Sequence, residues 1–307
     1  MTPGAAKKLG TSVAATEQRA CPVCGSDDAG LKYRLTRFSI LSCRACALVF
    51  LWPRPTPDEI RELFEQLYTS GEGSVPELKT YYSFCYDDEP DNPLVQLYES
   101  WLDRIEQHKS PGKILDVGCG TGLFLAVARR RGWQPYGIDE SAEATSHARE
   151  HFGLDVRVGE FSEFADDQLQ FDVITGWDIL EHARTPVALL ESVATSLSPG
   201  GLVALSTPNQ SNIIDRIAGT IYRLSLGRLP GPLEKFYIEQ HFIYFTPETM
   251  RDTLTRAGLD TISVDLELTD LRRLTLSPPM RLVLQSMFAA ARVLHLENRL
   301  FALARVA

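Results

Sequence analysis

The sequence predicts an α/β protein in which helices cover a mostly parallel β-sheet, preceded by a small metal-binding segment. Two observations carry this prediction. Between residues 113 and 206, short apolar runs rich in β-branched residues alternate with helical patterns, which is typical of βαβ units. Near the N-terminus, four of the six cysteines form two C-x-x-C pairs. In a chain without a secretory signal this spacing indicates a metal site rather than disulfides.

The composition is that of a globular protein and disfavours several functional classes. The 307 residues suffice for one large domain and a small one. The net charge of −9 argues against a large nucleic-acid footprint, because phosphate binding needs clustered Lys and Arg. We find no apolar run of about 18 residues, so no transmembrane helix is expected. The first 20 residues lack the apolar core of a signal peptide, and we expect a cytoplasmic protein.

The four paired cysteines predict a structural zinc site. They are Cys21, Cys24, Cys43 and Cys46, with 18 residues between the two pairs. Four thiolates form a closed tetrahedral shell around Zn²⁺ and leave no position for a catalytic water. Residues 31–35 and 38–41 are expected to be hairpin strands, so residues 21–57 form a zinc ribbon. Such a module either stabilises a small scaffold, which is the role we prefer, or binds nucleic acid.

The residues around the ribbon are expected to be less compact. Residues 1–20 are small and polar, and we predict a flexible N-terminus. Residues 48–57 are predicted to be an extended connector stiffened by proline. A helical segment over 58–110 begins at Pro57 and ends in a helix at about 94–109. The loop that precedes the helix at about 94–109 either closes over a ligand or anchors to the core through its aromatic residues, Tyr81, Tyr82, Phe84 and Tyr86.

A glycine-rich bend joins the first strand of the larger domain to a helix. Residues 114–117 form an apolar run, and Gly118, Gly120 and Gly122 follow before the helical pattern of residues 123–131. Glycine permits positive φ and lets a ligand approach bare backbone, and the helix N-terminus offers free N–H groups. The spacing is G-x-G-x-G, which differs from the dinucleotide fingerprint G-x-G-x-x-G. A purely structural turn is the alternative.

Two acidic residues lie at the ends of consecutive predicted strands. Asp116 precedes the bend, and Asp139 ends the run of residues 134–139. A carboxylate at a strand's carboxyl end can accept hydrogen bonds from both hydroxyls of a ribose. Ser141 then caps a helix that runs to about His151. The alternative for Asp139 is an acid that stabilises the start of this helix.

The strand acid and the glycine bend resemble motif I of the class I S-adenosylmethionine (SAM) methyltransferases. The resemblance implies a Rossmann-like, seven-stranded sheet with helices on both faces. Ribbon, Pro-Arg-Pro connector, helix and motif I in this order resemble the branch with an N-terminal zinc module, which includes sugar C-methyltransferases. The residues that the resemblance assigns to SAM lie at strand ends and in the bend: Asp116, Gly118, Cys119, Gly120, Gly122, Asp139, Glu140, Glu160, Phe161 and Trp177.

The remaining elements follow from the same resemblance. The methyltransferase domain is expected to span residues 111–307, with a motif IV segment, D-I-L-E-H, after its fourth strand. The last two strands are expected to form an antiparallel edge pair. The expected strands are 154–158, 171–175, 197–206, 259–268 and 298–305. Helical insertions are expected at 207–246, which we interpret as a substrate lid, and at 275–296, which forms either a dimer surface or a substrate wall.

The lid contains an amphipathic helix over about 213–226 and several basic residues: Arg216, Arg223, Arg228 and Lys235. These cations are suited to a phosphate or carboxylate on the substrate. A membrane surface or a protein partner is the alternative role for such a helix.

Methyl transfer from SAM requires alignment of a nucleophile and acceptance of its proton. Histidine titrates near neutrality, so His182 and His241 are the candidate bases, with Tyr244 and Glu181 weaker. Orienting motif IV or fixing the lid are the alternative roles for the two histidines. We predict methylation of a small molecule such as a sugar, a nucleotide-linked sugar or a natural-product intermediate. The alternatives are an RNA methyltransferase that docks through the ribbon, a non-catalytic relative and an NAD-dependent enzyme.

Overall fold

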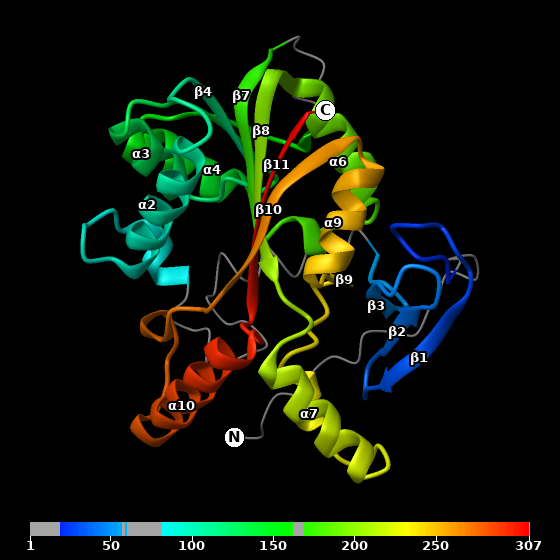
Figure 1. Ribbon diagram of the computed structural model, residues 1–307. Coiled ribbons are helices and arrows are strands. Elements are labelled where there is room, and N and C mark those ends of the chain that lie inside the picture. Colours follow the sequence, from blue (N-terminus) through cyan, green and yellow to red (C-terminus); the bar gives the residue numbers. More distant parts are fainter. Residues whose placement is uncertain (1–18, 57–58, 60–81, 162–168, 307) are drawn as a thin grey trace.

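The structure, a computed structural model, describes residues 19–56, 59, 82–161 and 169–306. The predicted flexible N-terminus at 1–20 and the predicted helix start at Pro57 lie almost entirely outside these residues, as does Tyr81. Two β-sheets organise the described chain, one of seven strands and one of four (Figure 1).

The seven-stranded sheet has the order β10-β11-β8-β7-β4-β5-β6. Its strands are β4 (Lys113–Val117), β5 (Gln134–Asp139), β6 (Asp155–Val158), β7 (Phe171–Trp177), β8 (Leu197–Pro208), β10 (Leu259–Glu267) and β11 (Arg299–Val306). Strands β4 to β8 are parallel, and β11 runs antiparallel to both β8 and β10. This confirms the Rossmann-like sheet and its antiparallel edge pair. The direction of winding reverses beside β4, where open α/β sheets bind ligands.

Helices cover both faces of this sheet (Figure 1). On one face lie α2 (Pro93–Glu106), α3 (Leu123–Arg130) and α4 (Ala142–Phe152). They share one apolar core whose members include Trp101, Phe124 and Phe152. On the other face lie α6 (Pro186–Ser196) and α9 (Pro247–Arg256), which contribute Leu190, Leu254 and their neighbours to a second core. Each fully buried Leu or Phe contributes about 1.5–3 kcal/mol, so packing fixes these helices more than helix propensity does.

Capping residues set where three helices begin. Asn92 accepts the N–H of Leu94 at the start of α2, and Pro93 follows it in the first turn. Ser141 accepts the N–H of Ala144 at the start of α4. Thr246 and Thr249 form a capping box at the start of α9. Each such cap contributes about 1 kcal/mol, and the caps at Ser141 and Thr246 confirm the predictions.

The cysteine segment forms a four-stranded antiparallel sheet with the order β1-β2-β3-β9. Strands β1 (Ala29–Arg34) and β2 (Ser39–Cys43) match the predicted hairpin. The prediction that residues 48–57 are an extended connector was wrong at its start, because β3 (Val49–Trp52) is a ribbon strand. Its first three side chains are buried, which is the physical reason that it pairs rather than extends into solvent. The fourth strand, β9 (Ile243–Tyr244), comes from the segment predicted to be the lid.

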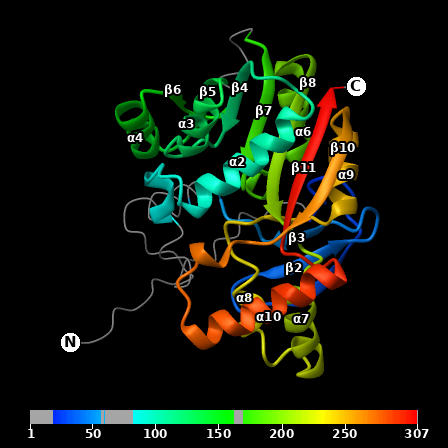
Figure 2. The same cartoon turned by 60° about the vertical axis from the view of Figure 1, so that its left-hand side comes forward.

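The remaining helices gather beyond the carboxyl ends of the parallel strands. They are α7 (Ile213–Leu224), the short α8 (Gly231–Glu234) and α10 (Pro278–Leu294). Figure 2 shows all three beneath the seven-stranded sheet, with α10 in front of α7. Helix α7 rests on the ribbon, where its Gly219 lies so close to the Tyr33 hydroxyl that a Cβ would be 2.3 Å from it. The ribbon and the 207–246 segment therefore pack as one unit, and the lid role of that segment stays a prediction.

Candidate functional site

The glycine bend after β4 has the conformation that the sequence predicted. Gly118, Gly120 and Gly122 have φ values of 73°, 51° and 82°, in the left-handed region that side chains rarely adopt. A Cβ on Gly122 would lie 2.8 Å from the Cβ of Ala148 in α4. A Cβ on Gly118 would lie 2.0 Å from the Cδ1 of Ile179. The bend is therefore held between α4 and the segment that follows β7, and it leaves no room for side chains.

Asp139 at the end of β5 holds the bend in place. Its two carboxylate oxygens accept the N–H groups of Gly120 and Ser141, each at 2.8 Å. One strand away, Asp116 is 2% exposed and accepts a 2.6 Å hydrogen bond from the Thr175 hydroxyl of β7. The bend and both acids thus lie at the switch point of the sheet, where the sequence placed them.

The electrostatics of these two acids favour a cationic ligand. Burial raises the pKa of Asp116 well above 3.8, and the charge of Asp139 raises it further. Burial also raises the pKa of Asp139. A cation beside these two carboxylates would favour their ionised forms. SAM carries a sulfonium and an ammonium group beside a ribose, so the residues present fit this cosubstrate.

Four other residues predicted to bind SAM lie around this point. Cys119 is buried, and its Sγ fills the space that a Cβ on Gly137 would occupy. Phe161 is 6% exposed and packs in the core beneath the ends of β4 and β5. Glu140 and Glu160 are exposed. In the structure Cys119 and Phe161 thus have apolar packing roles. SAM contacts by these two residues and by Glu140 and Glu160 stay predictions.

Trp177 ends β7 but faces the core. Its ring stacks on Trp101 of α2 with centroids 4.3 Å apart, and it meets the edge of Phe124. A role for Trp177 in SAM binding stays a prediction, and any such role would be indirect, through the packing of this core. The structure favours the anchoring interpretation for the 3-10 turn at Tyr82–Tyr86, because Phe84 packs against the same core. The Thr121 hydroxyl of the bend also donates to the carbonyl of Cys85 in this turn.

The D-I-L-E-H segment after β7 places a buried acid at the same edge of the sheet. Glu181 has no exposed surface, and its Oε2 accepts a 2.8 Å hydrogen bond from the Thr207 hydroxyl. Its Oε1 is buried without a hydrogen-bond partner among the described residues. Burial raises the Glu181 pKa to about 8, and the charge of Asp178 adds to this effect. An orphaned carboxylate oxygen of this kind is costly unless a proton or a cation meets it.

Two histidines complete what we call the catalytic cluster, defined as Glu181, His182 and His241. The His182 Nδ1 lies 2.6 Å from the carbonyl oxygen of Gln240, and the ring also has a backbone hydrogen bond to Asp178. The two imidazole rings lie 4.9 Å apart between centroids. Burial lowers the pKa of His182 and lowers that of His241 well below 6.5. Both rings are therefore neutral at physiological pH and able to accept a proton.

The cluster is close enough to act as one site and lies beside the bend. One ligand atom from each member lies within 4.8 Å of the others, a set that could also hold a divalent cation. The backbone N–H of Phe242 donates to the carbonyl of Glu181 at 2.8 Å, which ties the two segments together. Ile179, two residues before Glu181, covers Gly118 of the bend. The structure therefore brings His182 and His241 together and sets them next to the predicted SAM site.

Tyr244 has a different environment. It is 1% exposed, its hydroxyl donates to the carbonyl of Ile238 at 3.1 Å, and it packs against Tyr237 on the ribbon side. Burial raises its pKa well above 10, so it keeps its proton at neutral pH. The structure thus gives Tyr244 a positioning hydrogen bond beside His241, and its catalytic role stays a prediction.

Sequence reasoning missed two residues that shape the cluster. Asp178 has a positive φ of 58° and pairs with Arg299 at 2.6 Å. Arg299 also donates to the Ser206 hydroxyl of β8. The D-I-L-E-H pattern was a signal for Asp178. No sequence pattern pointed to Arg299, because this residue reaches the site only through the pairing of β11 with β8.

The four cysteines come together as the sequence predicted. The Cys21 and Cys46 sulfurs lie 3.5 Å apart, the Cys24 and Cys43 sulfurs 3.6 Å apart, and all four lie within 4.8 Å of one another. These distances exclude disulfide bonds. Metal–sulfur bonds of about 2.3 Å in a tetrahedron separate sulfurs by about 3.8 Å. The four thiols therefore fit a tetrahedral metal ion.

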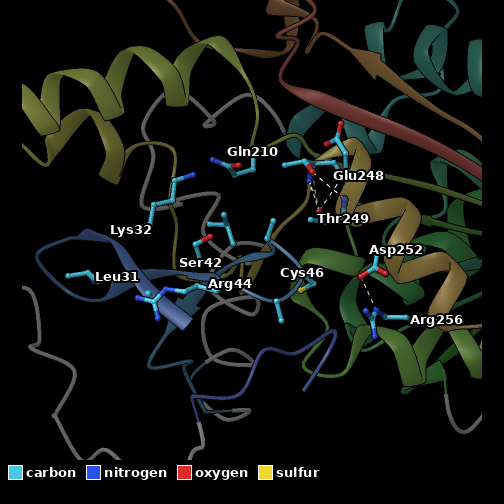
Figure 3. Close-up of a pocket in the computed structure, with 15 residues that line it drawn as sticks. Leu31, Lys32, Ser42, Arg44, Cys46, Gln210, Glu248, Thr249, Asp252 and Arg256 are labelled. Carbon is cyan, nitrogen blue, oxygen red and sulfur yellow. Dashed lines mark hydrogen bonds and ion pairs between the residues drawn. The ribbon is translucent and has the colours of Figure 1, made fainter. Parts of the chain in front are cut away.

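A groove lies between the ribbon and α9 (Figure 3) and encloses about 870 Å³. Cys46 of the thiol cluster is on its wall, as are Arg44 and Arg256. Its cations are paired within the protein, Arg44 with Asp28 at 2.6 Å and Arg256 with Asp252 at 2.8 Å. These pairs offset the charge that would attract an anion, so we assign the reaction to the sheet edge and not to this groove.

Comparison with known proteins agrees with this geometry. A family model described as a methyltransferase domain matches residues 93–264. A ubiquinone biosynthesis O-methyltransferase of Xanthomonas campestris is 36% identical over 132 residues, which are 40% of this chain and 55% of that protein. The corresponding protein of Acinetobacter baylyi is 30% identical over 179 residues, 54% of this chain and 72% of that protein. The chain thus spans about half the length of the first of these curated relatives.

Solved structures show the same fold. A SAM-dependent methyltransferase from Archaeoglobus fulgidus aligns with a TM-score of 0.50 and 17% identity, over 73% of this chain and 99% of that chain. Magnesium protoporphyrin IX methyltransferase from Synechocystis, with bound S-adenosylhomocysteine, aligns with a TM-score of 0.51 and 14% identity, over 81% of this chain and all of that one. At such identities the likeness concerns the fold alone.

Proposed function

The chain belongs to the methyltransferase domain family and is a class I SAM-dependent methyltransferase, and from this premise we propose that it methylates an oxygen atom of a small molecule. The curated relatives named above are O-methyltransferases of ubiquinone biosynthesis, whose acceptor is a small molecule. Supporting this acceptor type, the catalytic cluster provides two neutral imidazoles, which suit a nucleophile that must lose a proton.

One observation carries the SAM part of the proposal: the buried carboxylate of Asp116 and the partly buried carboxylate of Asp139 flank a bend of bare backbone. Bound SAM supplies a methyl group made electrophilic by its sulfonium. Asp116 would balance the positive charge of the ligand, and its own pKa would fall as it does so. Asp139 would keep the bend in place and offer its remaining lone pairs to the ribose hydroxyls.

The chain's own residues then prepare the acceptor. His182 is oriented by its backbone hydrogen bonds to Gln240 and Asp178 and would position His241. His241 lies beside it on the opposite segment and is our candidate for the group that removes the acceptor proton. Exclusion of water by the surrounding apolar residues strengthens each of these interactions.

The same three side chains support a second role, which the orphaned Oε1 of Glu181 favours. A divalent cation at the cluster would satisfy that oxygen and hold the acceptor oxygen in a deprotonated form. Dialysis against a chelator separates the two roles. Unchanged turnover supports the imidazole base, and turnover that returns on addition of Mg²⁺ or Mn²⁺ supports the cation.

We further propose that the four thiols hold structural Zn²⁺, because their separations suit that ion and the shell is closed. The cytoplasm, a homodimer and an anionic acceptor stay predictions. An RNA acceptor is the alternative, and the net charge of −9 weighs against it. A salt-sensitive mobility shift with RNA would favour it.

The experiment that tests the function combines binding and transfer. Titration calorimetry with SAM and S-adenosylhomocysteine should show binding to the wild type, and Asp139→Asn should weaken it at least about tenfold. Asp155→Asn, on the exposed start of β6, is the matched control and should bind normally. Transfer of labelled methyl groups is then measured on phenols, sugars and nucleotide-linked sugars. Absence of SAM binding by the wild type would refute the proposal.

A further inference from the structure

The exposed apolar side chains are concentrated in two segments of the chain. Among the described residues, thirteen large apolar side chains are exposed, and ten of them lie in two segments, residues 217–229 and 280–294. In the first segment they are Ile217, Ile221, Leu224, Leu226 and Leu229. In the second they are Met280, Leu282, Val283, Val293 and Leu294. We call these ten residues the α7–α10 surface. Apolar groups concentrated in this way mark a site of interaction.

The two helices expose these side chains as stripes. On α7, Ile217, Ile221 and Leu224 follow one another at helical spacing on the face opposite Gly219, which faces the ribbon. On α10, a helix of 17 residues, only Phe288 and Ala291 are buried. The helices meet where Ile213 packs with Ala291 and then diverge (Figures 1 and 2). Each helix therefore uses one narrow face to attach to the protein and presents a second apolar face to solvent.

The charge of these segments is of one sign. Residues 216–233 and 278–296 contain no Asp or Glu, although the whole chain carries a net charge of −9. They contain five arginines: Arg216, Arg223, Arg228, Arg281 and Arg292. By helical spacing Arg216 and Arg223 lie on one side of the α7 stripe, and Arg281 and Arg292 lie on one side of the α10 stripe. An apolar face edged by arginine is the pattern of helices that lie in a membrane interface.

We propose that the α7–α10 surface docks on an anionic phospholipid bilayer and holds the protein at its surface. The apolar stripes would enter the interface, and the exposed Arg216, Arg228 and Arg292 would meet lipid phosphates. Helix α7 begins five residues after β8 and α10 ends five residues before β11, so docking turns the carboxyl edge of the sheet toward the lipid. No helix in the described parts of the chain is long and apolar enough to cross a bilayer, so the contact is peripheral.

A second copy of the chain is the main rival occupant of this surface. A twofold interface through the α7–α10 surface would bring two identical sets of five arginines together without an acid on either helix face. Like charges opposed in this way disfavour the pairing. An anionic bilayer, by contrast, satisfies both the apolar stripes and the arginines, and for this reason we favour the lipid.

The test is co-sedimentation of the full chain with vesicles. We expect binding to phosphatidylcholine vesicles that contain phosphatidylglycerol, and at least about tenfold weaker binding to pure phosphatidylcholine. The double variant Leu224→Ser with Val293→Ser removes side chains that are 81% and 79% exposed and should weaken binding at least about tenfold. Leu31→Ser, on the ribbon and 54% exposed, is the control and should bind like the wild type.

A second pair of variants tests the charge. Arg216→Gln with Arg292→Gln should weaken binding to anionic vesicles. Arg157→Gln with Arg305→Gln changes the net charge equally on exposed positions of the seven-stranded sheet and should not. No binding of the wild type to anionic vesicles would overturn the proposal, as would equal binding to neutral ones. A concentration-dependent dimer by light scattering that the Leu224 and Val293 variant dissociates, without vesicle binding, would assign the surface to self-association instead.

Discussion

Substitution of Gly122 by alanine tests the geometry of the bend most directly. Gly122 has a φ of 82°, where an L side chain costs about 1–2 kcal/mol. The added Cβ would also lie 2.7 Å from Leu154 Cδ1 and 2.8 Å from Ala148 Cβ. Ala148 has no side-chain torsion with which to move away, so α4 or the bend must shift, and overpacking of this kind costs about 1–3 kcal/mol. The expected loss of stability is therefore about 2–5 kcal/mol.

The chain offers a matched control for the backbone part of this cost. Gly153 ends α4 with a φ of 60°, and a Cβ there would meet nothing within 4 Å. Gly153→Ala should therefore lose about 1–2 kcal/mol and bind SAM normally. The difference between the two variants isolates the steric contact, about 1–3 kcal/mol. Urea unfolding gives both free energies, and calorimetry should show that Gly122→Ala binds SAM at least about tenfold more weakly, because the shift moves the bend.

Equal stability of the Gly122 and Gly153 variants would refute the reasoning, because it would mean that no contact compresses the bend. Normal SAM affinity in a destabilised Gly122→Ala would instead separate the bend from SAM binding. A further variant, Gly122→Ala with Leu154→Val, relieves one of the two close contacts but not the one with Ala148. It should therefore regain only part of the lost stability.

Three further predictions concern the thiols, the catalytic cluster and the buried acid. Cys43→Ser should lower the metal content of the purified chain, measured by elemental analysis, from an expected one Zn²⁺ per molecule to a small fraction. It should also reduce stability in thermal melting. A melting temperature like that of the wild type would contradict a structural metal. His241→Ala should reduce turnover about 100-fold or more with little change in SAM affinity, and equal turnover would remove His241 as the base. Because burial raises the folded pKa of Asp116 well above 3.8, the carboxyl group's contribution to stability is fully present below that value and is lost as the pH rises through the folded pKa. The SAM-free wild type should then lose stability relative to Asp116→Asn as the pH rises above about 4, and parallel melting curves would exclude this.

Much of the fold was readable because local signals and packing agree. The bend, the caps at Ser141 and Thr246 and the strand over residues 134–139 depend on contacts within a few residues. Glycine spacing and capping residues report such contacts directly. The helix between β10 and β11 was likewise visible as an apolar run between two alternating ones.

The errors and omissions concern long-range pairing. Residues 49–52 follow the second cysteine pair and precede three prolines, so they suggested a connector. They are a strand because β2 pairs with all four of them, and because β9, from a distant part of the chain, covers the other edge of the first two. Arg299 was missed for the same reason. The burial of Glu181 also had no local signal, because it depends on Thr207 and on the return of the chain at Phe242.

The return of the chain at Phe242 also affects how the protein becomes active. The Phe242 carbonyl accepts the N–H of Leu51 in the ribbon at 2.9 Å, while the Phe242 N–H donates to Glu181. One residue next to His241 thus belongs to both the thiol-bearing sheet and the loop of the reaction. Under our proposal of a structural metal, a chain without that metal would not hold β3 in place against Phe242. Loading of the ribbon would then be required before His241 is positioned, and oxidation of the thiols would disturb His241 from the far side of the molecule.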